Sequence, residues 1–142
     1  MKDPVFEIPS DPKYIRPASA KLIRALRKLK LGRETLFDIR LCLEEAVINA
    51  IKYGNKLDSR LPVVISYAIS DGKIEITVRD QGEGFDYKAT PDPRSDTNIL
   101  KHGGRGIFLI KNLMDEVGYN DSGNEIKMIK FISGGKSHGS KR

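Results

Sequence analysis

Residues 41–54, LCLEEAVINAIKYG, predict a buried helix that carries a line of polar side chains. Apolar residues recur at helical spacing before and along this stretch and can face a core: Leu36, Ile39, Leu43, Val47, Ala50 and Ile51. Glu45 and Asn49 are four residues apart, so they project from one strip of the helix, and Tyr53 continues that strip. The strip is either the wet edge of an amphipathic helix or a row of polar groups that faces a ligand.

The composition is that of an ordinary folded domain. The chain has 142 residues, 39% of them hydrophobic and 31% charged, which excludes a disordered or fibrous chain. Its single cysteine, Cys42, cannot form an internal disulfide, and apolar neighbours favour a packed side chain over a nucleophile. No apolar run reaches the length of a membrane span, and the first ten residues lack the apolar segment of a signal peptide. A cytoplasmic protein without a membrane partner is therefore expected.

A basic segment precedes the polar strip. Residues 16–33 carry seven Lys or Arg side chains and no acidic one. Within them, residues 18–30 have an apolar stripe and predict an amphipathic helix with a basic outer face. This face is either solvated or meets an anionic partner. No helix-turn-helix pattern and no interleaved aromatic residues support direct reading of nucleic acid, so no nucleic-acid partner is expected.

The remaining periodicity predicts strands. Residues 5–8 alternate apolar and charged side chains and predict a short first strand. Residues 63–70 and 73–79 are two β-rich runs joined by Asp71-Gly72, a pair that predicts a hairpin. Residues 116–120 and 124–132 predict two closing strands, and residues 107–114 predict a buried helix before them.

Glycines gather at two further places. Asp80 follows a predicted strand, with Gly82 and Gly84 directly behind it. Glycine lets the backbone approach a flat ligand, and a strand-end carboxylate can accept a hydrogen bond from a ligand amino group. A solvent-exposed turn explains the same three residues equally well.

The second glycine cluster, residues 102–106 (HGGRG), opens the helix at 107–114. Free backbone N–H groups and the positive end of a helix dipole make such a cluster a phosphate site, and Arg105 adds a cation. Residues 87–101 before it show no periodicity, and a loop of this length is typical of a lid or a binding segment. The cluster is neither a Walker motif nor a dinucleotide fingerprint.

Taken in order, these motifs resemble the N, G1 and G2 boxes of the gyrase, chaperone and histidine-kinase ATPase superfamily. The resemblance covers residues 35–132. The quoted segments EEAVINAIKYGN (44–55), DQGEGFD (80–86) and GGRGIFLIKNLMDEV (103–117) are most similar to the bacterial anti-sigma-factor serine/threonine kinases, which are small stand-alone versions of the domain.

The resemblance implies a role for each residue of the helix strip. Asn49 would bind the Mg²⁺ that bridges the phosphates of ATP, and Glu45 would be the general base for a serine or threonine hydroxyl. Glu44 is an alternative carboxylate, but only Glu45 shares a strip with Asn49. Tyr53 stands near the phosphates, where many relatives have a basic residue or histidine. This departure leaves open how the phosphates are held there.

The resemblance also implies roles for the two glycine clusters. Asp80 would accept a hydrogen bond from the adenine amino group, with Gly82 and Gly84 shaping the adenine pocket. Gly104 and Gly106 would present backbone N–H groups to the phosphates, and Arg105 would stabilise charge during transfer.

The implied fold is an α/β two-layer sandwich of the Bergerat type, a mixed, mainly antiparallel sheet with helices on one face. It would be a single ATPase domain over residues 1–133, followed by a flexible polar tail over 134–142. The implied protein is an ATP-dependent serine/threonine kinase that phosphorylates an anti-sigma-factor antagonist, binds a sigma factor and forms a homodimer. The alternative is a non-catalytic nucleotide-binding switch, which would not need Glu45 as a base.

Overall fold

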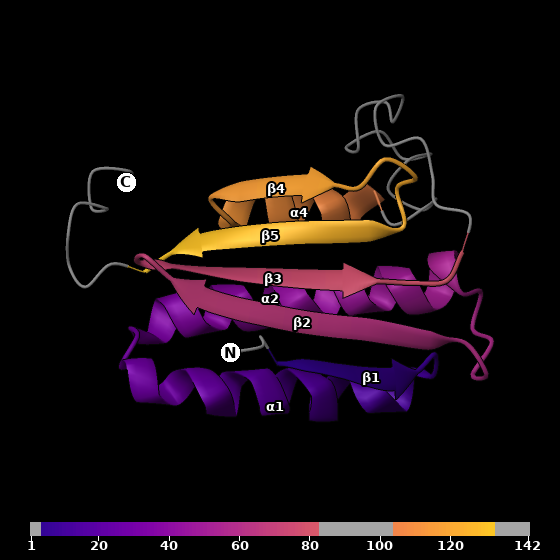
Figure 1. Cartoon of the computed structure of the whole chain (residues 1–142), viewed down its shortest axis with the longest axis horizontal. Helices are drawn as coiled ribbons and strands as arrows, with labels where there is room; N and C mark the ends of the chain where they lie inside the picture. The colour runs from indigo at the N-terminus through magenta and orange to yellow at the C-terminus, as the bar shows by residue number, and fades with distance from the viewer. Residues whose placement is uncertain (1–3, 83–103, 133–142) are drawn as a thin grey trace.

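Five strands form one sheet, and three α-helices cover one of its faces (Figure 1). The computed structural model describes residues 4–82 and 104–132. The strands, in the spatial order β1-β2-β3-β5-β4, are β1 (Val5–Pro9), β2 (Pro62–Ser70), β3 (Lys73–Arg79), β5 (Glu125–Phe131) and β4 (Glu116–Tyr119). The α-helices are α1 (Ile15–Leu26), α2 (Arg33–Asn49) and α4 (Gly104–Leu113). The predicted α/β sandwich with helices on one face is confirmed.

Every strand pairing in the described part of the chain is antiparallel, so these strands lack the parallel component of the expected mixed sheet. Tight reversals account for two of these pairings, β2 with β3 and β4 with β5, because they return the chain along its own strand. The other two pairs, β1 with β2 and β3 with β5, are joined by long connections that contain helices. Between β2 and β3, Asp71 and Gly72 have φ of 47° and 73°. Positive φ at both central residues is the turn geometry that matches the twist of a hairpin, as the Asp-Gly pair predicted.

The core lies between the sheet and the helices. Alternate residues of β3 point inward, so that Ile74, Ile76 and Val78 are buried against the helix layer. Helix α2 is the central helix, with α1 on one side and α4 on the other. Cys42 is buried on it, and burial together with the charge of Asp38 raises the pKa of its thiol to about 12. The prediction of a packed rather than a reactive cysteine is consistent with this pKa.

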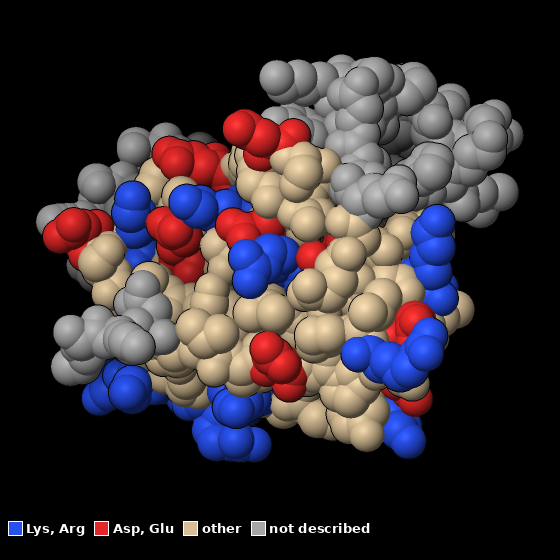
Figure 2. Space-filling view, turned by 45° about the vertical axis from the view of Figure 1, so that its right-hand side comes forward, with Lys and Arg blue, Asp and Glu red and all other residues tan. Residues whose placement is uncertain are grey.

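Helix α1 begins at Ile15, three residues before the predicted start. Pro17 therefore lies in its first turn, where a missing N–H breaks no intrahelical hydrogen bond. The predicted basic outer face is present: Arg16, Lys21 and Arg24 are all exposed. Figure 2 shows Lys and Arg side chains along the lower edge of the molecule, where α1 lies in Figure 1. Among the helices of the described residues, none is long and apolar enough to cross a membrane.

A partly buried lysine on β5 contacts the C-terminal end of α4. The Lys130 ammonium donates a hydrogen bond of 2.7 Å to the Leu113 carbonyl oxygen and lies 3.7 Å from the Asp38 carboxylate. A cation at a helix C-terminus interacts favourably with the helix dipole. Lys130 thereby connects β5, α2 and the C-terminal end of α4.

Three predictions fall outside the described residues. They concern the lid at 87–101, the site residue Gly84 and the polar tail at 134–142.

Candidate functional site

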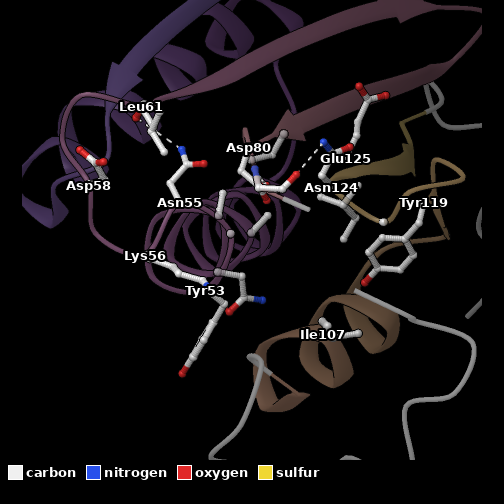
Figure 3. A pocket seen from close by; sticks show the side chains of 18 residues that line it. Tyr53, Asn55, Lys56, Asp58, Leu61, Asp80, Ile107, Tyr119, Asn124 and Glu125 are labelled. Atoms are coloured by element: carbon white, nitrogen blue, oxygen red, sulfur yellow. Dashed lines mark hydrogen bonds between the residues drawn. The ribbon is translucent and has the colours of Figure 1, made fainter. Parts of the chain in front are cut away.

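A cavity of about 660 Å³ opens where α2 ends beside the end of β3 (Figure 3). This volume is in the range of small-molecule sites. Its apolar walls come from α2 and the turn after it, from the sheet, and from α4: Ala46, Ala50, Val78, Ile107 and Ile126. Polar residues line it at what we call the Asp80 end (Gly54, Asn55, Asp80 and Gly82). Asn49 lines it as well, and Glu45 and Gly106 lie next to Asn49 without lining the cavity; we call these three residues the Gly106 end.

The Asp80 end is built by two glycines around one carboxylate. A Cβ on Gly54 would lie 2.2 Å from the Asp80 carboxyl carbon, and a Cβ on Gly82 would lie 2.3 Å from the Gly54 carbonyl oxygen. The backbone N–H of Gly82 donates a hydrogen bond of 2.8 Å to Asp80 Oδ1. Only glycine allows this approach at either position. The structure thus places Asp80 and Gly82 together, and it adds Gly54, the last residue of the predicted helix.

The Asp80 carboxylate is half-buried. Burial raises its pKa above the ordinary value, and the hydrogen bond from the Gly82 N–H lowers it in part. In Figure 3 Asp80 lies between Asn55 on one side and Asn124 and Tyr119 on the other. A carboxylate oxygen in this position can accept a hydrogen bond from a flat ligand held between the apolar walls.

A π-helical turn, Ala50–Gly54, ends the central helix. Its closing bond runs from the Asn55 N–H to the Ala50 carbonyl oxygen at 2.8 Å, five residues back. Such turns are rare and often occur at functional sites. The turn replaces the regular α-helix that the predicted strip assumed, yet Tyr53 still lines the cavity, with 40% of its surface exposed.

The Gly106 end joins α2 to the first turn of α4. A Cβ on Gly106 would lie 2.7 Å from Glu45 Oε1 and 3.3 Å from Asn49 Nδ2, so both polar side chains face the backbone of α4. Glu44 points elsewhere, because its Oε2 accepts a hydrogen bond of 2.6 Å from Ser19 on α1. Of the two adjacent carboxylates, Glu45 is therefore the one that faces α4 with Asn49.

Helix α4 begins at Gly104, so its first turn contains Gly104, Arg105 and Gly106. The unpaired backbone N–H groups of a helix start and the positive end of its dipole favour an anion there. Arg105 is exposed. The structure places Gly106 beside Glu45 and Asn49, with Gly104 and Arg105 in the same helical turn, while the roles of all three stay predictions.

Two asparagines that sequence reasoning missed support the Asp80 end. The Asn124 carbonyl oxygen accepts from the Asp80 N–H at 2.9 Å, and Asn124 Nδ2 donates to the Gly82 carbonyl oxygen at 3.3 Å. Asn55 Oδ1 accepts from the Gln81 N–H at 2.7 Å. Both asparagines occur in turn-like sequence, where the residue type alone gives no sign of a site.

ATP and Mg²⁺ fit these residues. Asp80 offers an acceptor to an amino group, and the apolar walls suit a base. The absence of a Cβ on Gly106 lets the Glu45 carboxylate and the Asn49 amide approach the start of α4. The described residues contain no group of three or more His, Cys, Asp or Glu that could hold a metal ion by themselves. Asn49 offers a single amide oxygen, so Mg²⁺ would need phosphate oxygens of the nucleotide as further ligands.

Comparison with known proteins agrees with this geometry. Residues 8–130 match the family described as the histidine kinase-like ATPase domain. The serine-protein kinase RsbW of Staphylococcus epidermidis is 35% identical to this chain over 135 residues, which cover 89% of this chain and 85% of that protein. The protein of the same name from Staphylococcus aureus strain MSSA476 is 34% identical over 132 residues, covering 82% of this chain and 83% of that protein.

A solved structure shares the fold. The crystal structure of the RsbU and RsbW domains of a Mycobacterium tuberculosis protein matches 92% of this chain with a TM-score of 0.62 and 18% identity. This chain spans 32% of that one, and at this identity the likeness concerns the fold alone. The two staphylococcal relatives and the family match show the family of this chain. The chain belongs to the histidine kinase-like ATPase domain family and, within it, to the RsbW serine-protein kinases.

Proposed function

We propose that this serine-protein kinase acts as an anti-sigma factor, which phosphorylates an anti-sigma-factor antagonist and binds a sigma factor. The observation that supports the enzymatic part is that Asp80 and Asn49 line one cavity, with Glu45 and Gly106 next to Asn49. The Asp80 end offers a hydrogen-bond acceptor for the amino group of a nucleobase. The Gly106 end offers the Glu45 carboxylate, the Asn49 amide and the start of helix α4. A nucleotide that spans them would have its transferable phosphate near Glu45.

The base of ATP would bind at the Asp80 end. Asp80 would accept a hydrogen bond from the adenine amino group, and Gly54 and Gly82 would let the carboxylate and the backbone approach the ring. Gly84, outside the described residues, would extend this pocket by resemblance. The apolar walls would pack against the ring faces and exclude water from the hydrogen bond.

The phosphates would bind at the Gly106 end. The backbone N–H groups of Gly104 and Gly106 would donate to phosphate oxygens, and Arg105 would balance charge as it moves to the leaving group. Asn49 would hold Mg²⁺ through its amide oxygen, and bound Mg²⁺ supplies charge neutralisation between the phosphates. Tyr53 lines the cavity near Asn49 and would contact the nucleotide there.

Glu45 would act on the protein substrate. Its carboxylate would accept the proton of a serine or threonine hydroxyl while the hydroxyl oxygen bonds to the γ-phosphorus. The bond from the γ-phosphorus to the bridging oxygen breaks at the same time, and ADP leaves with that electron pair. The position of Glu45 beside Gly106 supports this role, because the neighbouring carboxylate, Glu44, accepts a hydrogen bond from Ser19 instead.

The partners are inferred from the resemblance to anti-sigma-factor kinases. They are an antagonist protein as substrate, a sigma factor as the restrained partner and a second copy of this chain as a homodimer. Sigma factors act on transcription, so this role would place the protein in the cytoplasm.

The test joins binding to transfer. Calorimetry should show ATP binding that needs Mg²⁺, and mass spectrometry should find one phosphorylated serine or threonine on an antagonist protein of the same organism. A co-purification of the chain with a purified sigma factor tests the regulatory half. ATP binding without transfer to any antagonist would favour the non-catalytic switch, and no ATP binding at all would contradict the proposed site.

A further inference from the structure

Asn55 is a buried polar residue whose hydrogen bonds connect the end of the central helix to three other segments of the chain. Only 2% of its surface is exposed, and it follows directly on the π-helical turn that ends the central helix. Its N–H donates to the Ala50 carbonyl oxygen, which sets the backbone of Asn55 relative to that turn. Burying an amide side chain costs free energy unless its donors and acceptor are paired, so its hydrogen bonds show what it holds together.

All the hydrogen-bonding groups of the Asn55 side chain are engaged. Nδ2 donates to Ser10 Oγ at 2.8 Å and to the Pro62 carbonyl oxygen at 3.0 Å, with the Leu61 carbonyl oxygen at 3.4 Å. Oδ1 accepts from the Gln81 backbone N–H at 2.7 Å. Figure 3 draws the bond between Asn55 and Leu61 and shows Asn55 beside Asp80. With both Nδ2 hydrogens and Oδ1 used, Asn55 has little capacity left to recognise a ligand itself, although it lines the cavity.

The partner that matters for the site is Gln81. Gln81 stands between Asp80 and Gly82, so the bond to its N–H holds the turn that carries the carboxylate. The Asp80 carboxylate is half-buried against Gly54, and burial raises its pKa. A carboxylate that loses hydration is drawn back toward water. Its turn is therefore restrained from two sides, by Asn124 through the Asp80 N–H and the Gly82 carbonyl oxygen and by Asn55 through the Gln81 N–H.

We propose that Asn55 is a positioning residue for nucleotide selection, which holds the Asp80 carboxylate in reach of the adenine amino group through the Gln81 N–H. This inference rests on the proposed function, in which Asp80 accepts from that amino group. It assigns to Asn55 an effect on the choice between bases, whereas a purely structural role would change only the stability of the fold.

The test compares two ligands that differ in one group. ATP carries the amino group at position 6 of the purine, and purine riboside triphosphate lacks it. Calorimetry in Mg²⁺ gives the Kd of each, and the ratio of the two Kd values reports the hydrogen bond to Asp80. In the wild type the ratio should favour ATP, and Asn55→Ala should reduce that preference by about tenfold, the worth of a hydrogen bond to a charged group.

Ser10→Ala is the matched control. Ser10 is 1% exposed, and its hydroxyl accepts from Asn55 and donates to the Leu61 carbonyl oxygen at 2.6 Å. This variant damages the same buried network but keeps the bond to Gln81. It should lower the unfolding midpoint and leave the ligand preference unchanged.

A double variant and a conservative variant sharpen the test. Asn55→Ala combined with Asp80→Asn should show no lower preference than Asp80→Asn alone, because Asn55 acts through Asp80. Asn55→Asp keeps an oxygen acceptor for the Gln81 N–H but loses the Nδ2 donor to the Leu61 and Pro62 carbonyl oxygens. It should therefore unfold at a lower temperature and still keep most of the preference; loss of the preference in the folded variant would overturn the positioning role.

The outcomes separate the two proposals. A wild type that binds both ligands equally would overturn the role of Asp80 and, with it, this inference. A wild type that prefers ATP, with the same preference in Asn55→Ala, would overturn the positioning role alone. Loss of the preference in Ser10→Ala would also overturn it, since the effect would then follow general damage to the network.

Discussion

The side chains of the Asp80 end and of the Gly106 end are positioned in different ways. At the Asp80 end, the backbone N–H groups of Asp80, Gln81 and Gly82 each donate a hydrogen bond, to Asn124, Asn55 and the Asp80 carboxylate. At the Gly106 end, the Glu45 and Asn49 side chains make no hydrogen bond within the described part of the chain and are placed by packing against the α4 backbone.

This difference fits two different roles, recognition of a ligand shape at the Asp80 end and binding of a metal or a proton at the Gly106 end. Groups that recognise a fixed shape benefit from being preorganised by bonds within the protein, because little ordering cost remains when the ligand binds. Groups that bind a metal or take up a proton need free lone pairs. The hydrogen bonds of Glu45 and Asn49 are left for the ligands that the proposed function assigns to them.

The largest expected effect is on the phosphotransfer rate and comes from a change at the Gly106 end. Glu45→Gln keeps the shape of the side chain but removes the base, so phosphotransfer should fall by about 10²–10⁴-fold. ATP affinity should change little, because the proposed base contacts the hydroxyl of the protein substrate. Transfer rates and calorimetry on the same samples check both statements. Glu44→Gln is the neighbouring control and should stay active, since Glu44 faces Ser19; an inactive Glu44→Gln would reassign the base.

The next effect weakens the Asp80 end. Asp80→Asn should reduce ATP affinity by about 10- to 100-fold, the loss of one hydrogen bond to a charged acceptor. Unchanged affinity in calorimetry would contradict the adenine pocket described for this end.

The same variant should change the pH dependence of stability. The native pKa of Asp80 is raised above its usual 3.8, so the folded state binds this proton more tightly than the unfolded state. Asp80 therefore lowers stability at neutral pH, and its cost disappears as the pH falls through the raised pKa toward 3.8. Asp80→Asn should unfold at a higher temperature than the wild type at pH 7, and this advantage should shrink at acidic pH. A lower midpoint at pH 7 would show that the carboxylate stabilises the fold.

A smaller effect tests the close packing at the Asp80 end. Gly54→Ala places a Cβ 2.2 Å from the Asp80 carboxyl carbon, and relieving that clash should cost about 1–3 kcal/mol of unfolding free energy. Gly118→Ala, in β4, is the matched control, because nothing lies within 4 Å of its added Cβ. Denaturant unfolding of both variants measures the difference. Equal stability of the two would mean that the carboxylate moves aside freely.

The smallest expected effect is conditional on the metal. Asn49→Ala should lower ATP affinity about tenfold in Mg²⁺, the worth of one interaction with a charged partner, and hardly at all in a chelator. Titrations of wild type and variant under both conditions give the comparison. An equal loss with and without Mg²⁺ would argue that Asn49 binds the phosphates directly.

Much of this molecule could be predicted from local patterns. The strand alternation, the Asp71-Gly72 hairpin and the spacing of Glu45 and Asn49 depend on residues close together in the chain. The resemblance of three motifs then led to a family that the comparisons confirm. Sequence reasoning failed where a regular helix was assumed, because apolar periodicity does not mark the change to a π-helical turn at Ala50.

The sequence by itself determined the elements, their order and the candidate residues, because periodicity and turn chemistry act over a few neighbouring positions. Only the tertiary structure decided which of those residues meet. Asn55 and Gln81 are 26 residues apart, and Asn124 and Gly82 are 42 apart. Whether Gly54 must be glycine depends on the carboxylate of Asp80, the residue that follows β3, which the sheet brings against it. Contacts of this kind arise from how the layers pack, so no local pattern records them.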